Sequence, residues 1–230
     1  MKLQKETKRE TEAHGRWYGD ACGAAFAMEL IGERWTLLIV RELMLEGRRF
    51  SDIRASLPGL SAKVLTERLQ RLEDIGVLTR RNLPPPAAAQ IYELTEWGRE
   101  LEEVMQVLGR WSVRSPLHDP TLPLSPVSFI LSLRTMYDPA MAGTNSFEGL
   151  LRIGDEAFVV RLKGKRFEAD PGTADHPDFT LSSPAAPPLA GMVYGKVPVE
   201  NLAEAGVEFS GDRTALARFI DLFHLPEKTC

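Results

Sequence analysis

Two kinds of hydrophobic pattern divide the chain, and they meet at residues 115–126. Before this stretch, apolar residues recur every three or four positions, which is the spacing of one helical face, and after it short runs typical of β-strands appear. The stretch itself, SPLHDPTLPLSP, contains four prolines, and prolines interrupt both helices and sheet interiors. We therefore predict two folded units joined by a proline-rich linker.

The first unit covers residues 22–114 and follows a polar arm at residues 1–21. Its helical periodicity is broken at Gly47, at the Pro58-Gly59 pair and at Gly76, and such residues commonly end helices. Late in the unit, strands at 77–83 and 91–95 flank a Pro/Ala-rich tip at 84–89 and predict a β-hairpin. The predicted helices are 22–31, 33–45, 50–57, 62–75 and 97–113.

The second unit covers residues 127–225 and is followed by a short tail at 226–230. Gly-Asp and Lys-Gly-Lys turns separate its first three strands, as in an antiparallel meander. Strands are predicted at 147–153, 157–163, 166–169, 179–181 and 207–209, and helices at 126–137, 187–194 and 214–223. The predicted fold class is therefore α+β, with a mostly helical unit carrying a hairpin before a small α+β domain whose sheet is mainly antiparallel.

The net charge of −4 does not by itself indicate a nucleic-acid partner, but the charge is unevenly distributed. Residues 1–115 carry 18 Lys/Arg against 17 Asp/Glu, a balance of +1, whereas residues 116–230 carry 10 against 15, a balance of −5. Residues 48–81 alone carry eight basic and four acidic side chains, a balance of +4. A local basic patch is expected where a protein contacts phosphates, although an ordinary solvated surface is the alternative.

Other chemistry is sparse in the sequence. The two cysteines, Cys22 and Cys230, lie near opposite ends of the chain and favour the reducing cytosol over a disulfide framework. No apolar run approaches the roughly 18 residues that span a bilayer, and the N-terminus lacks the apolar core of a secretion signal. We therefore expect a cytoplasmic protein with no membrane contact, no metal or cofactor, and no enzymatic activity, because nucleophile–base and phosphate-loop motifs are missing. The four histidines have no metal-ligand spacing: His14, His118, His176 and His224.

The order helix, turn, helix, β-hairpin is that of a winged helix-turn-helix, whose second helix enters the DNA major groove. Here the turn is residues 57–60, and the helix after it keeps its apolar side chains on one side. Side chains on its polar side are predicted to contact base edges: Ser61, Ala62, Lys63, Thr66 and Gln70. Neighbouring side chains are predicted to contact phosphates, which orient a protein without specifying sequence: Arg48, Arg49, Arg71, Arg80, Arg81 and Gln90. The alternative is an ordinary amphipathic helix with a charged surface.

Residues 22–111 resemble the HxlR-type winged helix-turn-helix family of bacterial regulators. The matching segments are LIGERWTLLI at 30–39, RFSDI at 49–53, LPGLS at 57–61, LTERL at 65–69, GVL at 76–78 and YELTEWG at 92–98. This resemblance implies double-stranded DNA as a partner and a homodimer built from the helices that flank the winged helix. The sequence departs from the family at residues 87–90, where an arginine is common in the wing and this chain has Ala-Ala-Ala-Gln.

The apolar stripes of the flanking helices independently call for a partner surface, since they are too apolar for lone surface helices. Packing against the second domain is the alternative to dimerisation. The predicted dimer-interface residues are Phe26, Leu30, Leu101, Val104, Met105, Leu108 and Trp111.

Cys22 occupies the position at which some HxlR-type regulators carry a redox-sensing cysteine. A place near a helix N-terminus would favour the reactive thiolate. The family's usual Cys-Pro is Cys-Gly here, and a buried cysteine acting as a small hydrophobe is the alternative.

The second domain resembles the sterol carrier protein type two fold. Segments 178–181, 189–195, 203–206 and 209–223 carry this looser resemblance. It implies a sheet with helices on one face and an apolar cavity between them, although plain core is the alternative role for every residue of that cavity. The predicted cavity residues are Phe129, Met136, Phe158, Met192 and Phe219.

The main hypothesis is thus a dimeric, sequence-specific transcription regulator, most often a repressor, that senses an apolar small molecule or thiol oxidation. The alternative is a carrier of hydrophobic ligands whose winged helix serves only in dimerisation.

Overall fold

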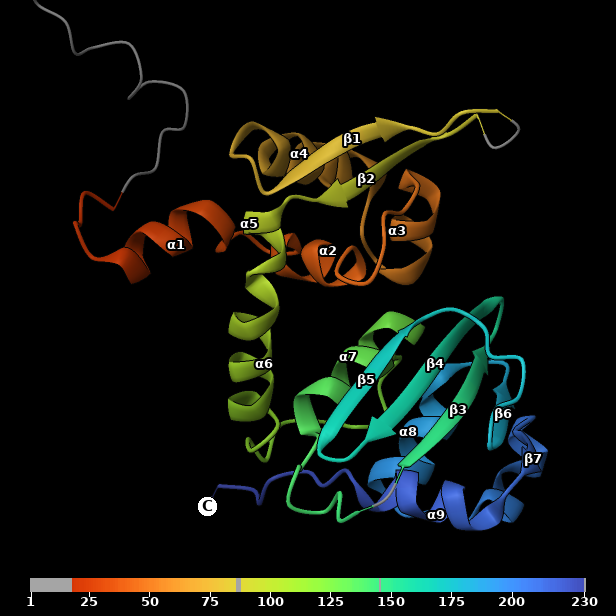
Figure 1. Ribbon diagram of the computed structural model, residues 1–230. Helices are drawn as coiled ribbons and strands as arrows, with labels where there is room; N and C mark the ends of the chain where they lie inside the picture. Colours follow the sequence, from red (N-terminus) through yellow and green to blue (C-terminus); the bar gives the residue numbers. More distant parts are fainter. Residues whose placement is uncertain (1–17, 86–87, 145, 230) are drawn as a thin grey trace, which may run out of the picture.

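The computed structural model describes residues 18–85, 88–144 and 146–229. Most of the predicted polar arm, two residues of the hairpin tip and Cys230 lie outside the described residues. The described chain is α+β, with a two-stranded hairpin and a separate five-stranded sheet (Figure 1). Across these residues, no helix combines the length and the apolar character needed to cross a membrane.

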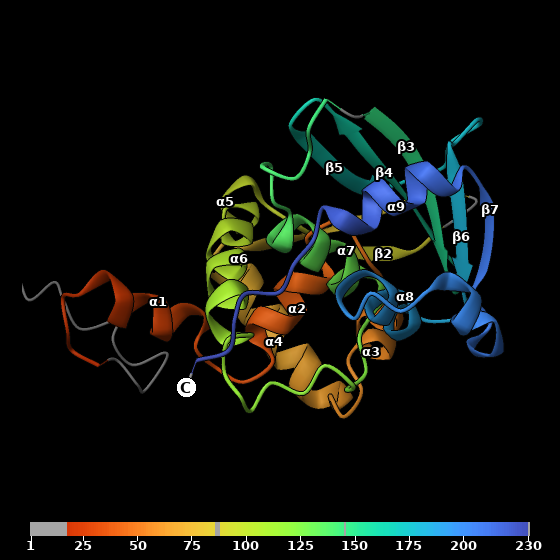
Figure 2. The same cartoon turned by 90° about the horizontal axis from the view of Figure 1, so that it is seen from below.

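The N-terminal half follows the predicted order of helices and hairpin. Its elements are α1 (Gly23–Ile31), α2 (Thr36–Glu42), α3 (Phe50–Ser56), α4 (Ala62–Asp74), β1 (Leu78–Asn82), β2 (Gln90–Leu94), α5 (Glu96–Arg99) and α6 (Leu101–Ser112). Helix α1 projects away from the rest of the chain in both views (Figures 1 and 2).

Two predicted helices differ in the structure. The helix expected over 33–45 begins only at Thr36, because Trp35 adopts a left-handed backbone with φ 79°, a conformation that an α-helix does not contain. The helix expected over 97–113 is divided at Glu100 into α5 and α6, where the backbone N–H of Glu100 bonds to the carbonyls of both Glu96 and Gly98.

The C-terminal half contains a sheet with helices packed on one face. Its elements are α7 (Pro126–Met136), β3 (Ser146–Ile153), β4 (Glu156–Lys163), β5 (Arg166–Pro171), β6 (Phe179–Ser183), α8 (Ala186–Tyr194), the 3₁₀ helix η1 (Val199–Ala205), β7 (Glu208–Gly211) and α9 (Arg213–Asp221). The strand order is β5-β4-β3-β6-β7, and only the β3–β6 pair is parallel. The predicted meander of the first three strands is confirmed, and the 3₁₀ helix was not predicted.

The two halves have separate hydrophobic cores, and helix α7 contributes to both of them. Its residues Val127 and Leu131 belong to the core of the winged-helix half. Phe129 and Leu133 belong to the core beneath the C-terminal sheet. The N-cap of α7 is also tied to the first half, because the Ser125 hydroxyl donates to the buried carboxylate of Glu42 at 2.8 Å. The proline-rich segment is therefore followed by a helix that packs against both halves.

Candidate nucleic-acid interface

Helix α4 is positioned by the tight turn that precedes it. Gly59 has φ +87°, a conformation that glycine adopts without steric cost. The Ser61 hydroxyl then caps α4 by accepting a hydrogen bond from the backbone N–H of Val64 at 3.3 Å. Leu65 and Leu69 on the inner side are at most 1% exposed, so the opposite, polar side must face outward.

All five residues predicted to contact bases are exposed on that outer side: Ser61, Ala62, Lys63, Thr66 and Gln70. The cation of Lys63 is highly accessible, with its Nζ 4.0 Å from Glu67 and its side chain 86% exposed. Gln70 is held more firmly, because it donates to Asp74 at 2.8 Å and accepts from Arg80 at 2.5 Å. Reading of a base by Gln70 would require this network to break, whereas Lys63 is available.

Two of the predicted phosphate contacts, Arg48 and Arg71, need correction because other parts of the protein hold their side chains. Arg48 is only 7% exposed and forms an ion pair with Glu156 of the C-terminal half. The guanidinium of Arg71 turns toward α1 and donates to the backbone carbonyl of Glu29 at 2.5 Å. Both were predicted from local charge alone, and both are held by partners that are distant in sequence.

The remaining predicted phosphate contacts are exposed. Arg80 and Arg81 extend from β1, where Arg80 donates to Glu73 at 2.7 Å and Arg81 to Glu93 at 3.0 Å. The hydrogen bond from Arg80 to Glu73 raises the pKa of Arg80. Arg49 lies exposed at the N-terminus of α3, and Gln90 lies exposed at the start of β2.

The predicted phosphate contacts did not include Arg54, an exposed arginine of the winged-helix half. Arg54 lies in the last turn of α3 and is exposed. Its place in the basic stretch 48–81 was the available signal. We therefore add Arg54 to the candidate phosphate contacts.

A second candidate surface is an apolar groove between α1 and the α5–α6 pair. The groove has a volume of about 1220 Å³ and is lined by residues that include Leu30, Leu101, Val104 and Leu108. The predicted dimer residues are accessible to different extents. Phe26, Val104, Leu108 and Trp111 are 48%, 45%, 42% and 73% exposed, whereas Leu30, Leu101 and Met105 are partly buried. Trp97 and Val107 were not predicted, and they add 48% and 55% exposed side chains to the same groove.

Cys22 is the N-cap residue of α1 and is exposed, so its interpretation as a buried hydrophobe is wrong for this chain. Hydrogen bonds from the backbone N–H groups of Ala25 and then Ala24 lower the pKa of the Cys22 thiol. This arrangement favours the thiolate, while a role in sensing stays a prediction.

The residues predicted to line a ligand cavity are mainly core residues. Phe129, Phe158, Met192 and Phe219 belong to the C-terminal core and are at most 1% exposed. Met192 also borders a groove of about 330 Å³ between α8 and α9, and Met136 borders another of about 420 Å³ beside His224. These residues do not surround one common cavity in the grooves described, and a ligand pocket stays a prediction. Among the residues that the structure describes, no group of three or more His, Cys, Asp or Glu is arranged to hold a metal ion.

Comparison with known proteins shows which family the N-terminal half of the chain resembles. The family model described as HxlR-like helix-turn-helix matches residues 30–117. The HTH-type transcriptional regulator YvaP of Bacillus subtilis is 38% identical over 86 residues, which cover 37% of this chain and 80% of YvaP. The chain belongs to the HxlR-like helix-turn-helix family. It is accordingly a DNA-binding transcription regulator of the helix-turn-helix class.

Other HxlR-like relatives match the same part of the chain. The regulator YodB of Bacillus subtilis is 40% identical over 86 residues, which cover 37% of this chain and 77% of YodB. The solved structure of the reduced form of YodB covers 44% of this chain and 100% of that chain, with 35% identity and a TM-score of 0.39. Each of these HxlR-like matches covers less than half of the present chain.

Proposed function

We propose that the chain is a homodimeric, sequence-specific regulator that represses transcription in the cytoplasm and contacts base edges with the outer side of α4. The observation that carries this proposal is the exposure of Lys63 and Thr66 on a capped helix whose opposite side is fully packed. The C-terminal half lies across α2 and α3 from α4 (Figure 1), so the acidic half of the chain leaves the outer side of α4 uncovered.

The groove between α1 and α6 supports the homodimer. Its exposed apolar residues, with Trp97 at 48% and Val107 at 55%, form a surface of the kind that marks protein interfaces. In a dimer, each chain presents one α4, and two helices spaced about one helical turn of DNA apart recognise a palindromic site. Dimerisation therefore supplies both the burial of this groove and the second half of the DNA-binding surface.

The signal is proposed to be an apolar small molecule bound by the C-terminal half, or oxidation of Cys22. The resemblance of that half to the sterol carrier protein type two fold supports the first, and the lowered pKa of Cys22 supports the second. Either signal controls DNA binding only if it stabilises one of two conformations over the other.

The decisive experiment is a footprint and mobility-shift titration on the chain's own upstream region. Lys63→Ala and Thr66→Ala should each weaken binding to the specific site by about 1–3 kcal/mol, with relaxed discrimination at one position. Lys163→Ala removes an exposed lysine at the end of β4 in the C-terminal sheet and is the matched control. Uniform weakening over all sequences would reduce Lys63 to a phosphate contact, and no selective shift by the unmodified chain would favour the carrier function.

Sedimentation velocity tests the homodimer separately. Leu108→Glu places a charge in the groove between α1 and α6 and should convert dimers to monomers. A monomeric unmodified chain would contradict the proposal.

A further inference from the structure

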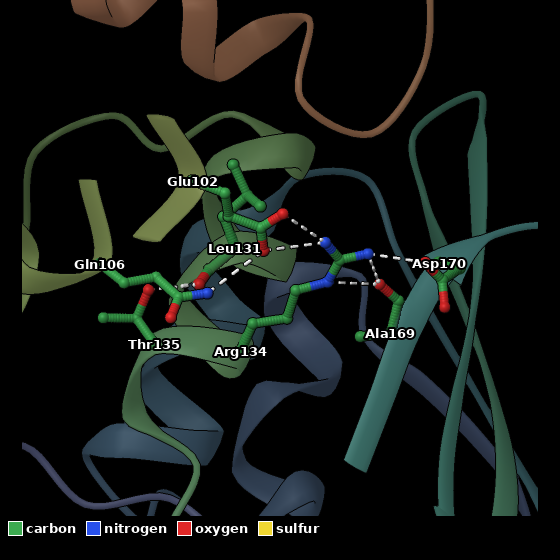
Figure 3. A network of polar contacts seen from close by, with 7 residues as sticks. All are labelled: Glu102, Gln106, Leu131, Arg134, Thr135, Ala169 and Asp170. Atoms are coloured by element: carbon green, nitrogen blue, oxygen red, sulfur yellow. Dashed lines mark hydrogen bonds and ion pairs between the residues drawn. The ribbon is translucent and has the colours of Figure 1, made fainter. Parts of the chain in front are cut away.

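Arg134 on α7 joins the proposed dimer helix to the C-terminal sheet (Figure 3). Its Nη1 donates to both carboxylate oxygens of Glu102 on α6, at 2.9 and 3.1 Å. Its Nε and Nη2 donate to the backbone carbonyl of Ala169 on β5, at 3.0 and 2.8 Å, and Nη2 also donates to Asp170 at 2.6 Å. The side chain of Arg134 is 21% exposed. All three of its guanidinium nitrogens donate hydrogen bonds, and the acceptors lie on two separate elements, α6 and β5.

A second polar contact joins the start of β4, close to where Asp170 pairs with this strand, to the base of the wing. Glu156 is the first residue of β4 and forms an ion pair with Arg48. The backbone of Arg48 is itself paired with Tyr92 of β2, with N–O distances of 2.9 Å and 2.8 Å. The backbone of Arg48 thus extends the hairpin sheet by one β-bridge. Its side chain, through the ion pair with Glu156, connects that sheet to the C-terminal half.

The two contacts are connected through a short piece of regular sheet. Strand β4 begins at Glu156 and pairs antiparallel with β5, with Val159 opposite Asp170 and Val160 opposite Ala169. Paired strands of this kind transmit displacement with little deformation because packed interiors are poorly compressible. A continuous path of hydrogen bonds and β-strand backbone therefore runs from the wing to α6 through the C-terminal half, outside the core of the winged helix.

We propose that Arg48, Glu156, Arg134 and Glu102 are positioning residues that make strands β4 and β5 a strut between the wing and α6. The strut fixes the angle of each wing relative to the dimer helix, and it gives the C-terminal half a direct mechanical role in DNA binding. This inference rests on the proposed function, because it assigns the strut's effect to the dimer on its DNA site. A dimer must present two wings and two α4 helices at one fixed spacing, so a looser wing angle lowers affinity without altering base preference.

The test compares Glu156→Gln, which opens the wing end of the strut, with Glu102→Gln, which opens the α6 end. Each variant should bind the specific site about three- to tenfold more weakly, within the range that changes along coupling networks produce. Base discrimination should be unchanged, and the double variant should lose less than the product of the two effects, because one strut cannot be opened twice. Glu148→Gln is the matched control, since it breaks the Glu148–Arg161 ion pair within the same sheet.

A second readout is independent of DNA. Spin labels at Asn82→Cys on β1 and Glu103→Cys on α6, in a background without Cys22 and Cys230, report the distance between wing and dimer helix. The distance distribution should widen in Glu156→Gln and in Glu102→Gln, and it should not change in Glu148→Gln.

The outcomes separate this inference from the proposed function. Unchanged affinity and unchanged distance distributions in both variants would overturn the strut, as would a double variant whose losses multiply. Tighter binding by Glu156→Gln would also overturn it, because Arg48 would then be a phosphate contact that Glu156 restrains. If the unmodified chain binds no specific DNA but the distributions widen as expected, the strut stands and the proposed function fails.

Discussion

Adjacent arginines at the start of α3 give a sharp test of how the chain contacts DNA phosphates. Arg49 is exposed, whereas Arg48 is 7% exposed and paired with Glu156. Each phosphate contact on duplex DNA changes the slope of log K against log salt concentration by about −0.9. A homodimer carries Arg49 twice, so Arg49→Gln should make the slope shallower by about 1.8, and Arg48→Gln should leave the slope unchanged.

The same reasoning limits the slope of the unmodified chain. A dimer with about eight phosphate contacts would give a slope near −7. Of the five arginines predicted to contact phosphate, four bind other groups of the protein: Arg48, Arg71, Arg80 and Arg81. We therefore expect a slope shallower than −7.

Fluorescence anisotropy with a labelled specific site, repeated over a series of potassium chloride concentrations, measures these slopes. Arg48→Gln should weaken binding by a similar factor at every salt concentration, as expected for a residue that positions the wing. We assign phosphate contacts to the arginines that are exposed. An equal change of slope in both variants, or no change in Arg49→Gln, would refute this assignment.

Three further predictions concern stability and reactivity. Leu131→Ala should lower the free energy of unfolding by about 2–5 kcal/mol. Chemical denaturation should still show one transition, because α7 packs in both cores. Two separated transitions would contradict this expectation. Gly149→Ala should cost about 1–3 kcal/mol or more, since a Cβ there would overlap the buried ring of Phe179; unchanged thermal unfolding would show that the ring moves at no cost. The pH midpoint of Cys22 alkylation should lie below that of a free cysteine thiol, because backbone N–H groups lower its pKa. Ala25→Pro removes one of these donors and should shift the midpoint upward. Identical midpoints in the unmodified chain and in Ala25→Pro would argue against the hydrogen bonds.

Local periodicity correctly predicted which side of α4 is buried and which is exposed. The 3.6-residue spacing of Leu65, Leu69 and Leu72 fixes which side of α4 is buried. The exposure of Lys63 and Thr66 follows from that spacing alone. Which of these side chains contacts bases stays a prediction.

The roles of the arginines could not be predicted in the same way. Arg48 and Arg49 are neighbours of identical type, yet only Arg48 meets Glu156, 108 positions along the chain. Likewise, Arg134 is an unremarkable residue of a predicted helix until the fold brings Glu102 and Asp170 beside it. Ion pairs between distant segments depend on tertiary packing, and hydrophobic patterning carries no signal for them.

Because α7 contributes to both hydrophobic cores, it also determines where the chain can be cut into separate fragments. Similarity to the HxlR-like family ends at residue 117, before α7 begins at Pro126. A fragment cut at that point would bare the apolar sides of α2 and α6 on which α7 lies, and exposed apolar surface promotes aggregation. A fragment of this helix-turn-helix unit for use in another regulator should therefore include α7.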